Sequence, residues 1–86
     1  MNMNSYCITF RSVTPAQKGE HLLRKSGYRP MLQRTPRWME EKGCGYCLRV
    51  QTDRLGEVTD LMRKNGVDFR KVYLLQPNGA TQEIRV

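Results

Sequence analysis

The sequence predicts an α+β fold of the ferredoxin-like, split βαβ type (βαββαβ), with an antiparallel sheet that carries two helices on one face. Three observations predict this fold. Short stretches alternate apolar and polar residues in period two, and two longer stretches have helical periodicity. In addition, residues 22–27 resemble residues 61–66, so a strand–helix–strand unit recurs at an offset of 39 residues.

The first unit begins with a strand over residues 5–11, where aromatic and aliphatic side chains alternate with smaller or polar ones. Thr14 followed by Pro15 predicts the start of a helix, with Thr14 as its N-cap and proline at its first position. Residues 28–34 predict the second strand. Because Pro30 has no backbone N–H to donate, we expect this strand at an edge of the sheet.

The second unit is preceded by a predicted helical turn over residues 36–42. Residues 46–51 predict the third strand, and Asp53 is the expected N-cap of the second helix. Residues 67–75 predict the fourth strand. After a Pro-Asn-Gly turn, residues 80–86 either pair back as an extra strand or fray.

Both predicted helices have one apolar stripe and end at a glycine, Gly27 in the first and Gly66 in the second. One stripe on each helix places both helices on the same sheet face, with the first and third strands central. The stripes consist of Ala16, Gly19, Leu22 and Leu23, and of Leu55, Val58, Leu61 and Met62.

The length of 86 residues predicts one domain over 1–86, with its core in 5–75 and a C-terminal turn and candidate extra strand in 76–86. Fifteen Lys and Arg against eight Asp and Glu give a net charge of +7, which favours acidic partners. Nucleic acid is not predicted as a partner, because charge is its only support and the aromatic residues form no RNA-binding motif.

The chain has no apolar stretch of membrane-spanning length, and its first residues do not have the pattern of a signal peptide. Three cysteines are an odd number and too few for a secreted disulfide framework, so we expect a reducing cytoplasm.

Cys44 and Cys47 form a C-x-x-C, the most distinctive local feature of the sequence. This spacing suits thiol–disulfide exchange, half of a metal site, or the carriage of sulfur or selenium on a nucleophilic thiolate. It is equally compatible with cysteines that only fill space. The residues expected to bind near the thiols are Gly45, which opens the backbone to a partner, and the cations Arg37, Lys42 and Arg49, which favour a thiolate; Glu40 and Glu41 oppose them.

No metal or cofactor is predicted. A structural zinc site normally needs four protein ligands, and the other candidates in one chain are Cys7 and His21. By helical phase His21 points away from the sheet, and we expect Cys7 to lie away from Cys47. The sequence also has no catalytic-triad order, P-loop or dinucleotide glycine pattern.

Taken together, several runs make the chain similar to a known family. The strand containing Ile8-Thr9-Phe10, the Thr35-Pro36-Arg37 run, and Cys44-Gly45 leading into Leu48-Arg49 resemble the selenium/sulfur carrier-like family of small bacterial proteins, over roughly residues 5–75. The role in the family's name is itself a proposal. The resemblance matches Cys44 to the family's Cys-Gly cysteine and Arg37 to its Pro-Arg arginine, and it departs from the family at residues 40–43, where relatives have small, serine-rich segments.

The resemblance and the C-x-x-C lead to one hypothesis. The protein is a cysteine-based carrier or relay for sulfur or selenium, more a carrier than an enzyme. Cys44 is the acceptor, Cys47 is the resolving thiol, and Arg37 and Arg49 hold the thiolate or an acidic face of a partner. The expected partner is a donor or acceptor protein such as a cysteine desulfurase, with a homodimer as a second expectation. The alternative is a binding or regulatory module that uses its open sheet face, with the cysteines incidental.

Overall fold

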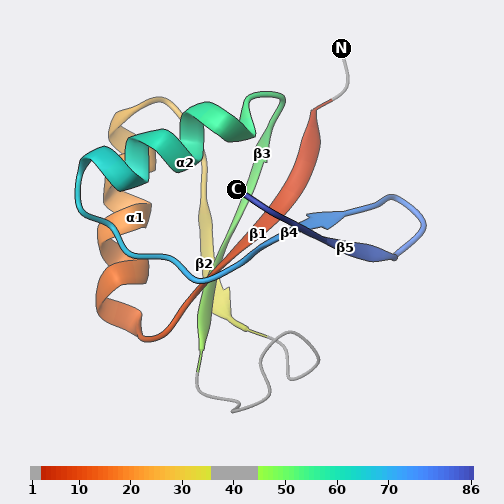
Figure 1. The fold of residues 1–86 in the computed structure, drawn as a ribbon, viewed down its shortest axis with the longest axis horizontal. Coiled ribbons are helices and arrows are strands. Elements are labelled where there is room, and N and C mark those ends of the chain that lie inside the picture. Colours follow the sequence, from red (N-terminus) through yellow and green to blue (C-terminus); the bar gives the residue numbers. More distant parts are fainter. Residues whose placement is uncertain (1–2, 36–44) are drawn as a thin grey trace.

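The computed structural model describes residues 3–35 and 45–86, which form two helices and a five-stranded antiparallel sheet (Figure 1). The predictions for the turn at 36–42 and for Arg37, Lys42 and Cys44 lie outside the described residues. In chain order the elements are β1 (Asn4–Phe10), α1 (Val13–Lys25), β2 (Met31–Arg34), β3 (Tyr46–Thr52), α2 (Leu55–Lys64), β4 (Val72–Leu75) and β5 (Thr81–Ile84).

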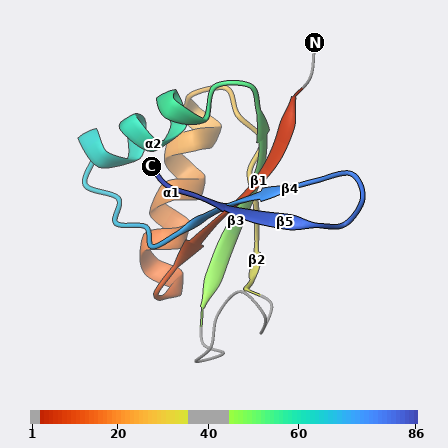
Figure 2. The same cartoon turned by 45° about the vertical axis from the view of Figure 1, so that its right-hand side comes forward.

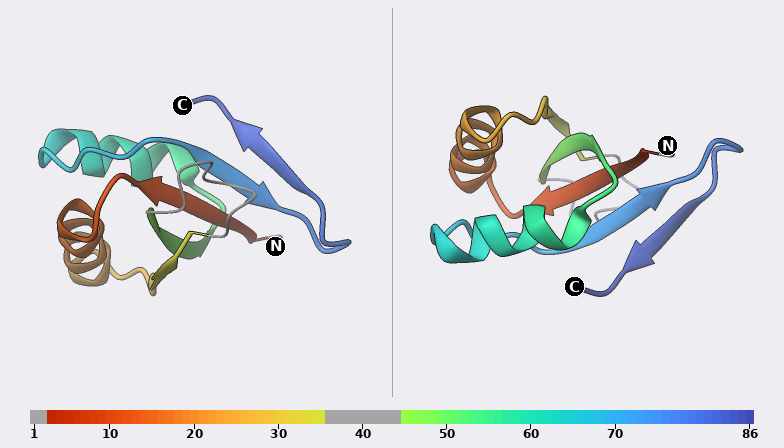
Figure 3. Two further views of the ribbon diagram at one scale, coloured as in Figure 1. Left: turned by 90° about the horizontal axis from the view of Figure 1, so that it is seen from below. Right: turned by 90° about the horizontal axis from the view of Figure 1, so that it is seen from above.

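The strands lie in the order β2-β3-β1-β4-β5, and every neighbouring pair is antiparallel. Both helices lie on the same side of the sheet (Figures 1 and 2). The predicted α+β class is therefore confirmed, and the order of the first four strands is compatible with the split βαβ plan. The prediction that β2 is an edge strand is also confirmed, and β5 adds the extra strand by pairing with β4. The β4–β5 hairpin extends away from the helices (Figure 3).

The sequence repeat is visible in the structure at the C-terminal ends of the helices. Gly27 and Gly66 have φ values of 93° and 71°, a conformation that glycine adopts without steric cost. The next residue in each copy donates its N–H to a carbonyl in the last turn: Tyr28 to Leu23 and Val67 to Met62, both at 2.9 Å. These matched hydrogen bonds satisfy carbonyls that a helix end would otherwise leave unpaired.

The helix starts differ from the prediction. The N-cap of α1 is Ser12 and not Thr14, and the N-cap of α2 is Arg54 and not Asp53. Pro15 therefore lies in the first turn of α1, where a missing N–H is tolerated because the first N–H groups have no partner within the helix. Near α2, the Thr52 hydroxyl accepts a hydrogen bond from the Arg54 N–H at 2.9 Å.

Two strands are shorter than predicted. The second begins at Met31 rather than at residue 28, because residues 26–28 complete the glycine-containing helix end. The fourth begins at Val72 rather than at residue 67. The residues just before it still bond to β1, since the Arg70 N–H donates to the Thr9 carbonyl and the Thr9 N–H donates to the Lys71 carbonyl, both at 2.8 Å.

The hydrophobic core lies between the helices and one face of the sheet. Gly19 sits where α1 comes closest to the sheet: a β-carbon at this position would lie 3.1 Å from Leu48 Cδ1 and 3.3 Å from Phe10 Cζ. Leu22 and Leu61, which were predicted to be core residues, are only partly buried at its margin. The fully enclosed members are Ile8, Phe10, Ala16, Leu23, Leu48, Val50, Val58, Met62, Val67 and Val72.

Candidate functional site

The sheet face opposite the helices carries both cysteines that the structure describes. Along β1, Ile8 and Phe10 point into the core, so Cys7 and Thr9 point to the opposite face. In the antiparallel register, Cys7 faces Arg49 and Thr9 faces Cys47. Cys7 and Cys47 are therefore diagonal neighbours on the two central strands.

The two thiols are in contact. The Cys7 Sγ donates a hydrogen bond to the Cys47 Sγ at 3.1 Å, and the two residues are 1% and 0% exposed. Tyr73 and Leu75, from the neighbouring strand β4, pack against the pair. Both cysteines are free thiols.

This contact contradicts the prediction that Cys7 lies away from Cys47. The first residue of β1, Asn4, pairs with Thr52 at the end of β3. Cys7 consequently pairs with Arg49 in the middle of β3, one diagonal step from Cys47. The period-two pattern placed both cysteines on the same face, but it carries no information on how far one strand is shifted along the other.

The pKa values of the two thiols are shifted in opposite directions. The pKa of Cys47 is lowered to about 7, chiefly because the Cys7 thiol donates a hydrogen bond to the Cys47 thiolate. Burial opposes this shift, whereas the polar side chains of Gln33 and Thr35 and the positive charge of Arg49 add to it. At neutral pH a substantial fraction of Cys47 is consequently a thiolate, the nucleophilic form of cysteine.

The same interactions act in the opposite sense on Cys7. Its pKa is raised well above the ordinary range, first because its proton is shared with Cys47, then through burial and repulsion by the Cys47 charge. Arg49 partly offsets this rise. The pair therefore consists of one thiolate and one thiol that keeps its proton, a combination suited to thiol exchange in two ordered steps.

Of the remaining predicted site residues, the structure describes Arg49 and Gly45. Arg49 is exposed and lies on the same sheet face as Cys47. Gly45 is buried, and its carbonyl accepts the Thr35 N–H at 3.0 Å, which joins the approaches to β3 and β2. Arg37, Lys42 and Cys44 lie outside the described residues, so their roles stay predictions.

Sequence reasoning missed three contributors to the site. Cys7 was considered only as a metal ligand, and the polar side chains of Gln33 and Thr35, which help to lower the pKa of Cys47, were not considered. Gln33 pairs directly with Cys47 between β2 and β3. The alternation of each strand contained a usable signal, because it assigns Cys7, Gln33 and Cys47 to the same face.

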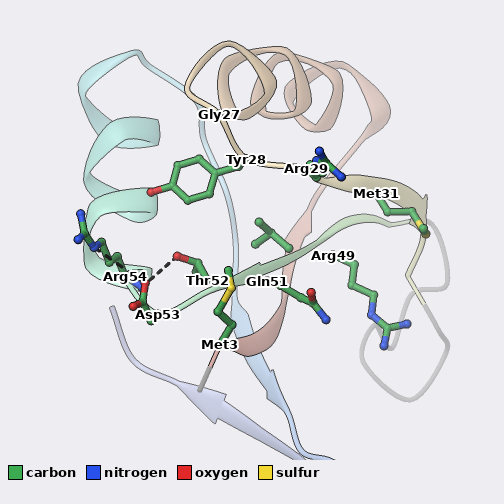
Figure 4. Close-up of a pocket in the computed structure, with 11 residues that line it drawn as sticks. Met3, Gly27, Tyr28, Arg29, Met31, Arg49, Gln51, Thr52, Asp53 and Arg54 are labelled. Atoms are coloured by element: carbon green, nitrogen blue, oxygen red, sulfur yellow. Dashed lines mark hydrogen bonds and ion pairs between the residues drawn. The ribbon is translucent and has the colours of Figure 1, made fainter. Parts of the chain in front are cut away.

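Arg49 also lines an open pocket of about 720 Å³ (Figure 4). Figure 4 shows Arg49 and Met31 at one end and Asp53 and Arg54 at the other. Arg54 forms ion pairs with Asp53 at 3.9 Å and with Glu57 at 3.7 Å, so part of its charge is neutralised. Three of the lining residues are arginines, namely Arg29, Arg49 and Arg54, against one acid, and the pocket is therefore suited to an anionic group.

Within residues 3–35 and 45–86, no group of three or more His, Cys, Asp or Glu side chains could hold a metal ion. In the same part of the chain, no helix has the length and apolar character needed to cross a membrane. His21, considered as a ligand from the sequence, is exposed on α1, as its helical phase predicted.

Comparison with known proteins gives one match. A family model described as "Putative Se/S carrier protein-like" matches residues 5–74, which covers both helices and the first four strands. No curated protein matches the chain, and no solved structure does.

Proposed function

This chain belongs to the Se/S carrier protein-like family, and from that membership we propose that it carries sulfur or selenium on a cysteine thiol, as a persulfide or a selenosulfide. The observation that carries the proposal is the contact between the thiols of Cys7 and Cys47, which lowers the pKa of Cys47. A carrier of this kind needs a nucleophilic sulfur and a second group that controls it. It does not need a deep cleft, which a domain of 86 residues has little interior to enclose.

The transfer step requires no cofactor and no external oxidant. A thiolate of the carrier attacks the outer sulfur of a persulfide on the donor, R–S–SH. A new sulfur–sulfur bond forms on the carrier, the sulfur–sulfur bond of the donor breaks, and the donor leaves as a thiolate. One sulfur atom moves without net oxidation or reduction, and a selenium atom moves by the same step.

We assign Cys44 as the first acceptor and Cys47 as the second thiol of the relay. Cys47 is 0% exposed, so a persulfide on a donor protein cannot reach it directly. Cys44 precedes it by three residues and is flanked by Gly43 and Gly45, and the resemblance matches it to the family's cysteine. Sulfur accepted by Cys44 would then pass to the Cys47 thiolate within the chain.

The donor is proposed to be a protein of the cysteine desulfurase type, encountered in a reducing compartment. The arginines of the pocket that Arg49 lines offer a docking surface for acidic side chains of the donor. Arg49 has two roles in this proposal, because its charge also favours the Cys47 thiolate. The roles predicted for Arg37 and Lys42 from the sequence are of the same kind.

Intact mass spectrometry tests the proposal. The purified protein is incubated with a cysteine desulfurase and cysteine, quickly freed of small thiols, and weighed at once, both before and after treatment with a reductant. We expect a gain of one sulfur atom that the reductant removes. The matched control is the double variant Cys44→Ser, Cys47→Ser, which should gain nothing. A wild-type mass that does not change would overturn the carrier function.

A second candidate function rests on Tyr73 and Leu75. These side chains pack on the thiol pair from the face opposite the helices and remain partly exposed. They would contribute to an interface with a second copy of the chain, in which the cysteines serve only packing. Sedimentation tests this candidate: a dimer that Leu75→Glu dissociates supports it, and a single 10.1 kDa species at high concentration excludes it.

A further inference from the structure

Cys7 lowers the pKa of Cys47 but takes no part in the transfer steps described so far, although its thiol touches Cys47. It lies on β1, forty residues away in sequence and on the neighbouring central strand. Its sulfur is 3.1 Å from the Cys47 sulfur, and a disulfide requires about 2.05 Å. A displacement of about 1 Å therefore separates the thiol pair from a covalent bond.

We propose that Cys7 is the releasing thiol of the carrier: it attacks the Cys47 sulfur of a Cys47 persulfide or selenosulfide and expels the carried atom as sulfide or selenide. This inference rests on the proposed carrier function and adds the step in which the carried atom is released. It assigns to the described residues a reaction that neither the C-x-x-C spacing nor the family match contains.

The step balances without another reagent. The Cys7 thiol reacts with the Cys47 persulfide to give the Cys7–Cys47 disulfide and hydrogen sulfide. The bond between Cys47 and the carried sulfur breaks, and the bond between the two cysteine sulfurs forms. The Cys7 proton passes to the carried sulfur as the Cys7 sulfur attacks, so the attacking group is a thiolate and the leaving group departs as hydrogen sulfide. The carried sulfur gains the two electrons that the thiol pair loses. An external dithiol then returns the disulfide to two thiols by exchange, which resets the carrier.

The surroundings of the pair favour this order of events. Cys47 is the thiolate, so it takes the sulfur from the preceding thiol, whereas Cys7 keeps its proton and does not compete as an acceptor. Tyr73 and Leu75 pack against the pair, so Cys7, already in contact with Cys47, reaches the persulfide sooner than an external thiol does. Release of the carried sulfur by Cys7 is therefore faster than release by an external thiol.

The position of the pair also fits a bond that forms and breaks repeatedly. Diagonal partners on antiparallel strands have α-carbons farther apart than directly opposed partners. A disulfide between them draws the strands together locally, and such a bond is more easily reduced than a relaxed one. A turnover intermediate requires this property, whereas a permanent cross-link would not.

Trypsin distinguishes the possible disulfides, because it leaves Cys7 in peptide 1–11 and both Cys44 and Cys47 in peptide 43–49. Wild-type protein is loaded with a cysteine desulfurase and cysteine, freed of small thiols, and left without reductant. We expect free sulfide to form and peptides 1–11 and 43–49 to become joined, with fragment ions that locate the bond on Cys47. A bond confined to peptide 43–49 would assign release to Cys44 and overturn the proposal.

Cys7→Ser is the decisive variant, because serine keeps a hydrogen-bond donor next to Cys47 but cannot form a disulfide. It should still accept sulfur, because Cys44 is the first acceptor, and it should release no sulfide until a reductant is added. Ser5→Ala, two residues earlier on the same face of β1, is the matched control and should load and release normally. Sulfide release from Cys7→Ser at the wild-type rate would overturn the releasing role alone. Failure of the wild type to load would overturn the carrier function, and the release step with it.

Discussion

The Cys7 thiol on β1 donates a hydrogen bond to the Cys47 sulfur on β3 across 3.1 Å, in an enclosed position on the sheet face opposite the helices. The contact makes Cys47 the more acidic and Cys7 the less acidic of two chemically identical groups. It joins residues that no local motif connects, and it places the thiol chemistry on the two central strands of the sheet.

The first prediction concerns the acidity of Cys47. Its pKa is lowered to about 7, so its thiolate fraction should rise as the pH increases through 7, below the ~8.5 of a free cysteine. The pH dependence of thiolate ultraviolet absorbance in Cys44→Ser measures this, since Cys7 stays protonated over that range. Adding Cys7→Ala removes the main hydrogen-bond donor and should move the midpoint upward, whereas adding Cys7→Ser should move it less. A midpoint that Cys7→Ala leaves unchanged would show that the thiol contact does not control the acidity.

The second prediction concerns Arg49. Arg49→Gln removes a positive charge that favours the Cys47 thiolate and lines the neighbouring pocket. The rate of sulfur transfer from a cysteine desulfurase should therefore fall, and the loss should shrink as salt concentration rises, because the charge effect on an exposed group is screened. Lys64→Gln, an exposed charge at the end of α2, is the control. Equal rates for the two variants would remove Arg49 from the mechanism.

The third prediction separates two neighbouring residues of α2. Met62 is 0% exposed in the core, whereas Leu61 is partly buried at its margin. Met62→Ala should lower the free energy of unfolding by ~2–5 kcal/mol, the range for large-to-small changes in a packed core. Leu61→Ala should cost less. Chemical denaturation measures both, and a larger loss for Leu61→Ala would contradict the observed rotation of α2.

The fourth prediction compares two helical glycines. A β-carbon on Gly56 of α2 would meet nothing within 4 Å, so Gly56→Ala should stabilise the protein by up to ~1 kcal/mol through helix propensity. At Gly19 the β-carbon would crowd Leu48 and Phe10, both 0% exposed and unable to move aside freely. Gly19→Ala should therefore lose that gain and lower the thermal midpoint. A rise for both variants would show that α1 does not approach the sheet as closely as described.

Much of this fold could be predicted from local sequence patterns, because the determining interactions are local. Gly27 and Gly66 mark the helix ends, since only a left-handed residue completes those turns. Pro30 precedes a strand that lies at the edge of the sheet. The helix starts were less predictable. Thr14 and Asp53 are good capping residues by type, yet Ser12 and Arg54 hold the N-caps, and neither N-cap side chain makes a capping hydrogen bond.

The candidate site was harder to predict because its main contact is not local. Alternation assigned Cys7 and Cys47 to the same face, but their contact depends on the shift of β1 along β3, which the whole sheet determines. The sequence drew attention to Cys44 through the C-x-x-C spacing. The structure shows a second partner for Cys47, namely Cys7. The family match over residues 5–74 includes both of these cysteines.

The most direct test of the carrier function is to locate the transferred sulfur in the chain. After incubation with a cysteine desulfurase and cysteine, persulfides are trapped by alkylation and the protein is digested with trypsin. We predict that the added sulfur lies in peptide 43–49, that Cys44→Ser slows its arrival, and that Cys47→Ser leaves it on Cys44. Sulfur found only in peptide 1–11, or in none of the cysteine peptides, would contradict the account.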